Sequence, residues 1–397
     1  MVGSMNGTIY MPVGEVCSSI SDTYREKKNM VTLINTSDVL EGRVLNHERV
    51  PNSNLKGQFK KTFQRDDILY SEIRPQNRRF AYVDFSPIDY IASTKLMVIR
   101  AKKDVVSPKY LYYFLKNSST VAELQLLAET RSGTFPQITF SEVANLTIPV
   151  PSLAVQEVIV QTMQCLEDKI TCNEQINDNL EQQAQSYFQE LFVDNANPEW
   201  TTGTISDLGA VVGGSTPSKA KPEYYTESGI AWITPKDLSI NKSKFVSHGE
   251  NDITELGLKN SSAAIMPEGT VLFSSRAPIG YIAIAAGEVT TNQGFKSVVP
   301  KPEIGTPFVY FFLKNTLPVI EGMASGSTFK EVSGSTMKNV PAVIPDAETL
   351  AKFSDFCAPI FAQQRILEEQ NQSLATLRDN LLPKLMSGEI DVSAVQL

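Results

Sequence analysis

Arginine side chains recur just after a β-rich run in each half of this 397-residue chain. Arg74 follows Ile68–Ser71 in the segment SEIRPQN, and Arg276 follows Thr270–Ser275 in the segment SSRAPIG. A guanidinium group can donate two hydrogen bonds to guanine or clamp a phosphate. The recurrence therefore favours a DNA contact for both residues, with a solvated surface charge as the alternative.

Amide side chains and further basic residues lie in or beside similar turns. Asn77, Asn292 and Gln293 could read adenine, because a side-chain amide can pair with both N6 and N7 of that base. For every candidate the alternative is a solvated charge or a structural cap. The other basic candidates are Arg78 and Arg79 in RPQNRRF, Lys219, Lys221 and Lys236 in or after GGSTPSKAKPEYY, and Arg131 and Lys330 beside the SGTF and GSTF turns.

The sequence contains no complete catalytic motif. It has no GxxxxGK[ST] phosphate loop, and Gly213–Pro217 (GGSTP) does not follow GxGxxG, so a turn is favoured over a nucleotide cradle. The segment NPEW at 197–200 only faintly resembles the NPPY-type motif of DNA adenine methyltransferases, because Glu199 stands where proline belongs. With only His47 and His248 and no CxxC pair, no metal site is predicted. We therefore expect a chain that is not an enzyme.

The same landmarks appear twice, in the same order. YLYYFLKN at 110–117 returns as FVYFFLKN at 308–315, GTF at 133–135 as STF at 327–329, and NLTIPVP at 145–151 as NVPAVIP at 339–345. Two similar modules can place two similar binding surfaces around a pseudo-twofold axis. A DNA duplex that is read at two half-sites has this symmetry.

The elements that must position these residues form two mixed modules and two helical segments. Short β-rich runs and aromatic helices alternate within residues 1–150 and again within 196–345. Pro108 and Pro307 begin corresponding helices, whose aromatic side chains have helical spacing and are expected in the core. The predicted fold class is α+β, with long helices in residues 151–195 and 346–397.

Each helical segment carries a narrow heptad seam of apolar residues. The two seams match residue for residue at a constant offset, so that Asn177 corresponds to Asn371. Such a narrow seam needs a partner helix, and a twofold relation makes the two helices an antiparallel coiled coil. At about 35–40 residues each would be about 55–60 Å long, a rigid spacer between the modules. A seam asparagine typically fixes register, although both could simply be solvated.

Charge and composition fit a chain that binds DNA through its modules. The net charge is −8, but residues 1–150 carry +4 and residues 196–345 carry −1, whereas the helical segments carry −7 and −4. The helices should therefore repel DNA. No apolar run is long enough for a membrane span, and no signal pattern begins the chain, so a cytoplasmic location is expected. The four cysteines are expected to be buried apolar side chains.

A longer series of motifs resembles the specificity subunit of type I restriction-modification systems, which defend cells against foreign DNA. The motifs are GGSTPSKAKPEYY, IAWITPKDL, LFSSRAPIGYIAIA, TTNQGFKSVVP, LLPKLMSGEIDV and, in the first half, IPVPSLAVQEVI. The similarity spans essentially the whole chain. The first half has SEIRPQN and ASTKL where the second half has SSRAPIG and TNQG.

The resemblance implies that each module is a target-recognition domain that reads one half of a bipartite DNA sequence. It also implies that the long helices dock modification (methyltransferase) subunits. No cofactor is then expected in this chain, since S-adenosylmethionine and ATP would belong to partner subunits. Whether a restriction subunit joins is left open. The alternatives are a coiled-coil protein-interaction scaffold that does not bind DNA, and an enzyme with an unfamiliar site.

Overall fold

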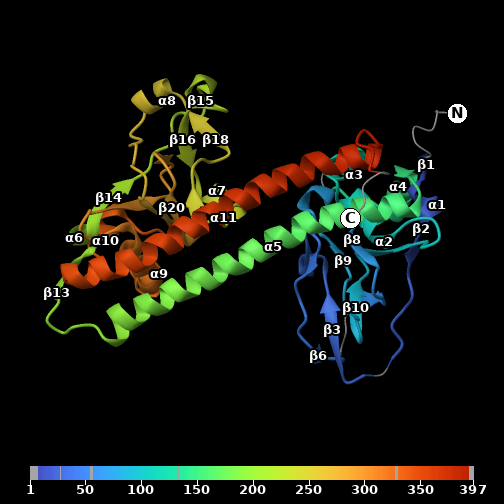
Figure 1. Ribbon diagram of the computed structural model, residues 1–397, viewed down its shortest axis with the longest axis horizontal. Coiled ribbons are helices and arrows are strands. Elements are labelled where there is room, and N and C mark those ends of the chain that lie inside the picture. Colours follow the sequence, from blue (N-terminus) through green and yellow to red (C-terminus); the bar gives the residue numbers. More distant parts are fainter. Residues whose placement is uncertain (1–7, 27, 54–56, 132–134, 327–329, 393–397) are drawn as a thin grey trace. The chain divides into compact units, whose positions relative to one another are not determined.

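The computed structural model describes residues 8–26, 28–53, 57–131, 135–326 and 330–392 (Figure 1). The chain divides into two compact units. Unit 1 contains the chain up to Ile170 together with the residues from Ser373 onward, and unit 2 contains Thr171–Gln372. No helix in the described part of the chain is long and apolar enough to cross a lipid bilayer.

Unit 1 contains two sheets, which we call its inner and outer sheets. The inner sheet is antiparallel and lies nearer the long helices in Figure 1. The outer sheet contains one parallel pair, β3 with β10. The inner order is β2 (Cys17–Ile20), β11 (Leu96–Ala101), β8 (Ile68–Ser71) and β9 (Phe80–Tyr82), and the outer order is β6 (Val50–Pro51), β3 (Met30–Ile34), β10 (Tyr90–Ser93) and β7 (Phe59–Lys61).

Shorter elements and helices complete unit 1. The 3-10 turn η2 and helix α3 begin close to the candidate residues of the first module. The elements are strand pairs β1 (Ile9–Pro12) with β12 (Thr147–Val150) and β4 (Val39–Leu40) with β5 (Arg43–Val44), helices α1 (Val13–Val16), α2 (Pro108–Lys116), α3 (Ser118–Arg131) and α4 (Phe140–Asn145), and turns η1 (Thr36–Asp38) and η2 (Pro75–Asn77).

Unit 2 has the same plan. Its inner sheet is β14 (Gly209–Gly213), β22 (Lys296–Pro300), β19 (Val271–Ser275), β20 (Ile279–Ala285) and β17 (Phe245–Val246). Its outer sheet is β15 (Tyr225–Thr226), β18 (Asn251–Ile253), β16 (Ile230–Ile233) and β21 (Thr290–Thr291). The other elements are β13 (Thr201–Thr204) with β23 (Pro341–Ile344), α6 (Ile205–Leu208), η4 (Pro222–Tyr224), α7 (Pro235–Ile240), α8 (Glu255–Lys259), α9 (Thr306–Gly322) and α10 (Gly334–Lys338).

The internal repeat predicted from the sequence is confirmed by these elements. In both units a strand, a one-turn helix and a second strand open the module, and a strand pair closes it with β1–β12 or β13–β23. In both units a parallel pair lies in the outer sheet, β3 with β10 and β16 with β21. The α+β class is confirmed as well.

Two long helices, α5 (Leu153–Gln189) and α11 (Ala347–Ser387), contribute to both units, and a π-helical turn (Glu190–Asp194) follows α5. Within unit 2, Asn173 contacts Asn371, whereas Phe188 packs against Phe353. Residue numbers therefore rise along one helix as they fall along the other, so the predicted antiparallel direction is confirmed in unit 2.

The main core of each unit lies between its inner sheet, its aromatic helix and the long helices. In unit 1, Tyr110 and Tyr113 of α2 are fully buried together with Ile159 of α5 and Leu385 of α11. The prediction that the aromatic helix faces the core is confirmed. The expected burial of all four cysteines is wrong for two of them. Cys17 and Cys357 are buried, but Cys165 and Cys172 of α5 are exposed.

Candidate nucleic-acid interface

Two turns of unit 2 meet at the end of β19. The backbone nitrogen of Ser275 donates to the carbonyl oxygen of Gly294 at 2.7 Å, and the Ser275 hydroxyl donates to the same oxygen at 3.1 Å. The nitrogen of Val332 donates to the Ser275 carbonyl at 2.9 Å. The structure therefore brings Arg276 together with the turn that carries Asn292 and Gln293.

The loop GGSTP packs onto this pair of turns. The Ser215 nitrogen donates to the Thr291 carbonyl at 2.8 Å, and the Thr216 hydroxyl contacts Oε1 of Gln293. A Cβ atom at Gly214 would lie only 1.9 Å from the carbonyl oxygen of Asn292. Glycine is thus required for the loop to approach so closely, which is a structural reason for this motif.

The amide side chains of this junction are partly used by the turn itself. Oδ1 of Asn292 accepts a hydrogen bond of 2.8 Å from the nitrogen of Gly294. Oε1 of Gln293 contacts Thr216. Adenine recognition by either amide remains a prediction, and it would require Gln293 to exchange its contact with Thr216.

Arg276 is half-buried and has an acidic neighbour. Its guanidinium lies 3.5 Å from a carboxylate oxygen of Glu331, and Lys296 lies 3.9 Å from the other oxygen. Burial lowers the pKa of Lys296, and Arg276 lowers it further, although Glu331 acts in the opposite direction. Lys330 is exposed and adjoins Glu331. The GSTF turn beside it falls on residues 327–329, which lie outside the described residues.

The remaining lysine candidates of unit 2 are exposed. Lys236 forms an ion pair of 2.5 Å with Glu250, which raises the pKa of Lys236. Lys221 donates to the phenol oxygen of Tyr224 at 3.0 Å, and this bond raises the pKa of Lys221. Lys219 lies in the exposed loop before η4. Lys236 adjoins the junction, because the neighbouring Pro235 would be 3.0 Å from a Cβ atom at Gly294.

In unit 1 the candidates cluster around η2. Arg74 and Arg78 precede and follow this turn with φ values of 44° and 52°, a left-handed conformation that non-glycine residues seldom adopt. Arg74, Gln76 and Asn77 are exposed. The Gln76 nitrogen donates to Oε1 of the buried Gln125 at 3.1 Å, which fixes the turn on α3.

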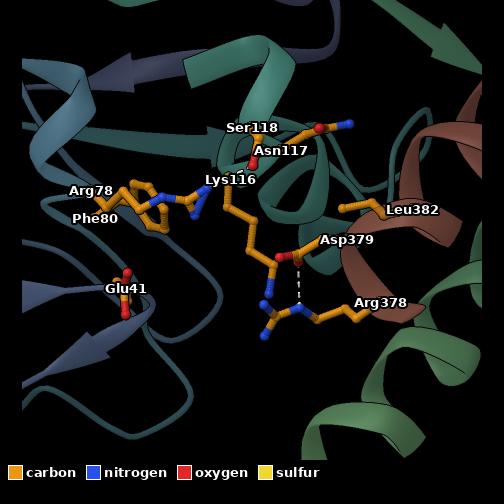
Figure 2. Close-up of a pocket in the computed structure, with 9 residues that line it drawn as sticks. All are labelled: Glu41, Arg78, Phe80, Lys116, Asn117, Ser118, Arg378, Asp379 and Leu382. Atoms are coloured by element: carbon orange, nitrogen blue, oxygen red, sulfur yellow. Dashed lines mark hydrogen bonds and ion pairs between the residues drawn. The ribbon is translucent and has the colours of Figure 1, made fainter. Parts of the chain in front are cut away.

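Two of the four η2 candidates are engaged within the unit. Arg79 donates to the carbonyl oxygen of Ser37 at 2.9 Å, so it holds the segment before β4. Arg78 donates to the Ser118 hydroxyl at 2.9 Å and lines a pocket of about 110 Å³ (Figure 2). In Figure 2 the side chains of Lys116 and Arg378 lie around the same pocket. Arg74 and Asn77 are therefore the candidates of this group best placed to contact a ligand.

The correspondence between Arg74 and Arg276 holds for the strand but not for the position in the turn. The nitrogen of Ile138 donates to the Glu72 carbonyl, as that of Val332 donates to Ser275. Counting from these bonds, Ile73 corresponds to Arg276, and Arg74 corresponds to Ala277. Arg74 and Ala277 share a positive φ, 44° and 50°. The sequence comparison missed this shift of one residue.

Arg131 ends α3, and its guanidinium contacts the Glu142 carboxylate at 2.8 Å. Thr139 donates to the same carboxylate through its backbone nitrogen and its hydroxyl, and the pKa of Glu142 is lowered although burial opposes the shift. The SGTF turn beside Arg131 falls mostly on residues 132–134, outside the described residues.

The two seam asparagines have different surroundings in unit 2. Asn371 accepts a 2.8 Å hydrogen bond from Nδ2 of Asn173, a residue that the sequence analysis did not single out. The backbone carbonyl of Asn177 accepts from Gln364 at 3.1 Å, whereas its Oδ1 is buried and has no hydrogen-bond partner among the described residues. A register role for Asn177 and Asn371 remains a prediction.

Within the described ranges, no three histidine, cysteine or acidic side chains are grouped so that they could hold a metal ion.

The sequence analysis missed basic residues at the turns of both units. Lys61 donates to the carbonyl oxygen of Thr94 after β10, Lys95 to Oε1 of Gln137, and Lys296 to the carbonyl oxygen of Gln293. A comparison of ASTKL with TNQG would have drawn attention to Lys95, since it occupies the place of Gly294.

Paired modules, each with an inner sheet, an outer sheet and a share of an antiparallel helix pair, define the class of protein. The family described as the type I restriction modification DNA specificity domain matches residues 10–182 and 197–377. The chain belongs to this family, and the resemblance inferred from its motifs is confirmed. It is thus a DNA-recognition subunit of the restriction-modification class.

Some relatives are similar to this chain over most of its length, and one is similar over about half of it. The HindI specificity subunit of Haemophilus influenzae is 29% identical and covers 91% of this chain and 94% of its own length. The MjaIX specificity subunit of Methanocaldococcus jannaschii is 39% identical over 47% of this chain and 45% of its own. The crystal structure of the type I S subunit from M. genitalium has the same fold, with a TM-score of 0.55, 17% identity and 99% coverage of both chains.

Proposed function

We propose that this chain reads a bipartite DNA target, with one unit at each half-site. The single observation that supports this most strongly is the recurrence of one junction of turns in both units. In unit 2 the turns after β19 and β21 meet beside residue 332, and in unit 1 the turns after β8 and β10 meet beside residue 138. Exposed turns held on a rigid inner sheet are suited to reading base edges and phosphates.

Phosphate contacts from lysine and arginine would set position and affinity, and base-edge contacts would set the sequence. Arg74, Asn77 and Arg276 are the residues that we assign to this task first. Lys219, Lys221, Lys236, Arg131 and Lys330 would supply further phosphate contacts. Arg131 and Lys236, which form ion pairs with Glu142 and Glu250, would have to break these pairs in order to contact a phosphate.

The helix pair is assigned to partner binding. From Thr171 to Asp194, along the second half of α5 and its π-helical turn, the sequence contains acidic residues but no lysine or arginine, so this stretch is poorly suited to DNA. Modification subunits would dock on the helices, bind S-adenosylmethionine and methylate adenines that they flip out of the duplex. Methylation and any ATP-dependent cleavage would then be carried out by partner subunits, with this chain selecting the site. A scaffold that does not bind DNA is disfavoured by the family assignment.

Methylome sequencing tests the proposal in a cell that contains the modification subunit, with and without this chain. The expected result is a bipartite adenine-methylation motif that disappears when the chain is absent. Methylation that is identical in both strains would contradict the proposal. An active-site variant of the modification subunit is the matched control, because it should remove the same motif while this chain is still present.

A further inference from the structure

A half-buried lysine lies inside the junction of unit 2. Nζ of Lys296 donates to the carbonyl oxygens of Gln293 and Phe295, both at 3.3 Å. Its side chain is 16% exposed, and its methylene groups would be 3.8–3.9 Å from Cβ atoms placed at Gly213 and Gly334. The position of this lysine is therefore fixed by backbone on several sides. We call it the inner lysine of unit 2.

A second cation lies next to the inner lysine, towards solvent. Arg276 is 37% exposed, and it shares the Glu331 carboxylate with Lys296 at 3.5 and 3.9 Å. Backbone hydrogen bonds between Ser325 and Glu331 hold the carboxylate in place. Two positive charges thus face a single negative one, and the outer cation can be reached from solvent.

Unit 1 contains a related arrangement, in which the outer cation forms the ion pair with the carboxylate and the inner lysine contacts the backbone of the turn. Nζ of Lys61 donates to the carbonyl oxygens of Thr94 and Leu96, at 3.1 and 2.7 Å. Leu96 pairs with Ser71 as Phe295 pairs with Ser274, so these two carbonyls correspond to those of Gln293 and Phe295. Lys61 is the inner lysine of unit 1.

The outer cation of unit 1 is Lys95, which is 49% exposed. Its Nζ lies 3.4 Å from the Glu72 carboxylate and 3.0 Å from Oε1 of Gln137. Burial lowers the pKa of Lys61, whereas Glu72 raises it and Lys95 lowers it. Unit 1 again has two cations and one carboxylate at the junction.

None of these charged side chains occupies corresponding positions in the two copies. Lys61 belongs to β7 and Lys296 to β22, while Lys95 corresponds to Gly294. Glu72 corresponds to Ser275, and Glu331 corresponds to Gln137. Each junction thus has an inner lysine on the same two carbonyls and an outer cation paired with a carboxylate, although different positions supply them, which indicates that both units require this chemistry.

We propose that the cation pair of each unit binds one phosphodiester of the DNA backbone, and that the carboxylate is a resident counter-ion that this phosphate displaces. This inference rests on the proposed function and adds a defined ligand and site to it. A phosphate oxygen carries the charge of the displaced carboxylate and can accept from both cations. Because the phosphate must displace the carboxylate, binding to any DNA is weakened. A duplex then binds tightly only when it also makes base contacts elsewhere on the unit.

The experiment measures binding of the full chain, in complex with its modification subunit, to a target duplex and to a scrambled duplex by fluorescence anisotropy at several salt concentrations. Glu331→Gln and Glu72→Gln are each expected to tighten binding about three- to tenfold at low salt, equally on both duplexes. The gain should shrink at high salt and vanish in the double variant Arg276→Gln/Glu331→Gln.

Removal of an outer cation should have the opposite effect. Arg276→Gln and Lys95→Gln should weaken binding to both duplexes alike, and each should reduce the slope of log affinity against log salt by about 0.9, the value for one lost phosphate contact. Thermal unfolding of each variant shows whether the unit remains folded. Glu303→Gln is the matched control, since it removes an exposed carboxylate at the opposite end of β22 and should change neither affinity nor slope.

The outcomes separate this inference from the function on which it rests. If the wild-type complex binds neither duplex, the proposed function fails. If it binds the target but Glu331→Gln and Glu72→Gln behave like wild type, the phosphate site alone is overturned. A loss in Arg276→Gln that is confined to the target duplex would likewise overturn the site, because it would show base reading instead.

Discussion

Asn173 donates a 2.8 Å hydrogen bond to Asn371 across the helix pair of unit 2. One turn further along α5, Oδ1 of Asn177 is buried, and the described residues offer it no hydrogen-bond partner. By the same antiparallel register, Asn177 lies opposite Leu367, which is buried and cannot donate. Two asparagines that match in the internal repeat therefore have unlike environments.

We expect Asn177→Leu to stabilise unit 2 and Asn371→Leu to destabilise it. An unsatisfied buried polar group costs about 1–3 kcal/mol, so its removal should recover part of that free energy. Removing Asn371 instead leaves Nδ2 of the buried Asn173 with only its 3.5 Å contact to Gln370, at a cost of about 1–3 kcal/mol. Urea unfolding of the two single variants measures both effects. Equal changes in the two would show that the environments do not differ.

Charge removal at Arg74 should weaken recognition of one half-site, whereas charge removal at Arg276 should weaken binding of unit 2 to any DNA sequence. A lost base contact costs about 1–3 kcal/mol at one position, whereas a lost phosphate contact weakens binding to all sequences. Competition between duplexes altered in one half-site or the other identifies the half that Arg74 contacts. Arg79→Ala is a useful comparison, because Arg79 is bound to the Ser37 carbonyl and should act through stability. Unchanged affinity and specificity would remove the assignment for that arginine.

Gly214→Ala should disturb the junction of unit 2. The new methyl group would lie 1.9 Å from the Asn292 carbonyl oxygen, and overpacking of this kind costs about 1–3 kcal/mol. Binding at one half-site should fall together with the melting temperature. The matched control is Gly287→Ala, because no atom lies within 4 Å of its added Cβ, and its effect should stay within about 0.5 kcal/mol. Similar losses in both variants would argue against the close approach.

Acid should weaken unit 2 through Glu181. Burial alone would raise the pKa of Glu181, but Lys244 and Lys314 prevail and hold the pKa below its ordinary value of 4.5. A depressed folded-state pKa stabilises the protein above 4.5, and this stabilisation is lost as the pH falls through the folded-state pKa. The free energy of unfolding, measured from pH 6 to pH 3, should therefore decline as the pH falls below about 4.5.

Glu181→Gln should flatten that pH dependence. At neutral pH it should cost about 3–5 kcal/mol, because Lys244, which is 6% exposed, would lose its carboxylate partner. The exposed residue Glu288 provides a control, and Glu288→Gln should leave the pH profile unchanged. A wild-type-like profile for Glu181→Gln would assign the acid sensitivity to other groups.

A heptad inserted into both long helices should change the spacing of the recognised half-sites. Insertion after Ile170 in α5 and after Gln372 in α11 falls at the boundaries of the two units. Seven residues add about 10.5 Å of helix and preserve the seam. At about 3.4 Å per base pair, the gap between half-sites should grow by about three base pairs, which methylome sequencing would reveal. An insertion in α5 alone is the control, and it should abolish recognition.

Much of the fold could be predicted because its signals are local. Apolar β-rich runs such as Ile68–Ser71 and Val271–Ser275 became buried central strands, and the heptad seams became the helix pair. In the outer sheets Ile230–Ile233 was predicted as a strand and became β16, but most of the other strands escaped prediction, because strands such as β6 and β15 have only two residues and depend on partners distant in sequence.

The candidate site was predicted less well, because the charged side chains that meet there come from distant parts of the sequence. Sequence patterns identified Arg276 by its recurring strand, but the Glu331 that contacts it lies 55 residues further along the chain. Lys61 and Lys296 contact corresponding carbonyls from different strands, so no alignment of the two copies could pair them. Asn173 was not singled out, because its pairing with Asn371 depends on the register that only the folded helices define.

The course of the chain through unit 1 has a consequence for its biosynthesis. The core of this unit includes Leu382, Leu385 and Val392, which are translated after the whole of unit 2, whereas unit 2 is one continuous segment. During synthesis, unit 2 can therefore fold while unit 1, which still lacks this part of its core, exposes an apolar surface. We expect a premature stop codon near position 372 to spare unit 2 and to turn unit 1 into a substrate for chaperones and proteases.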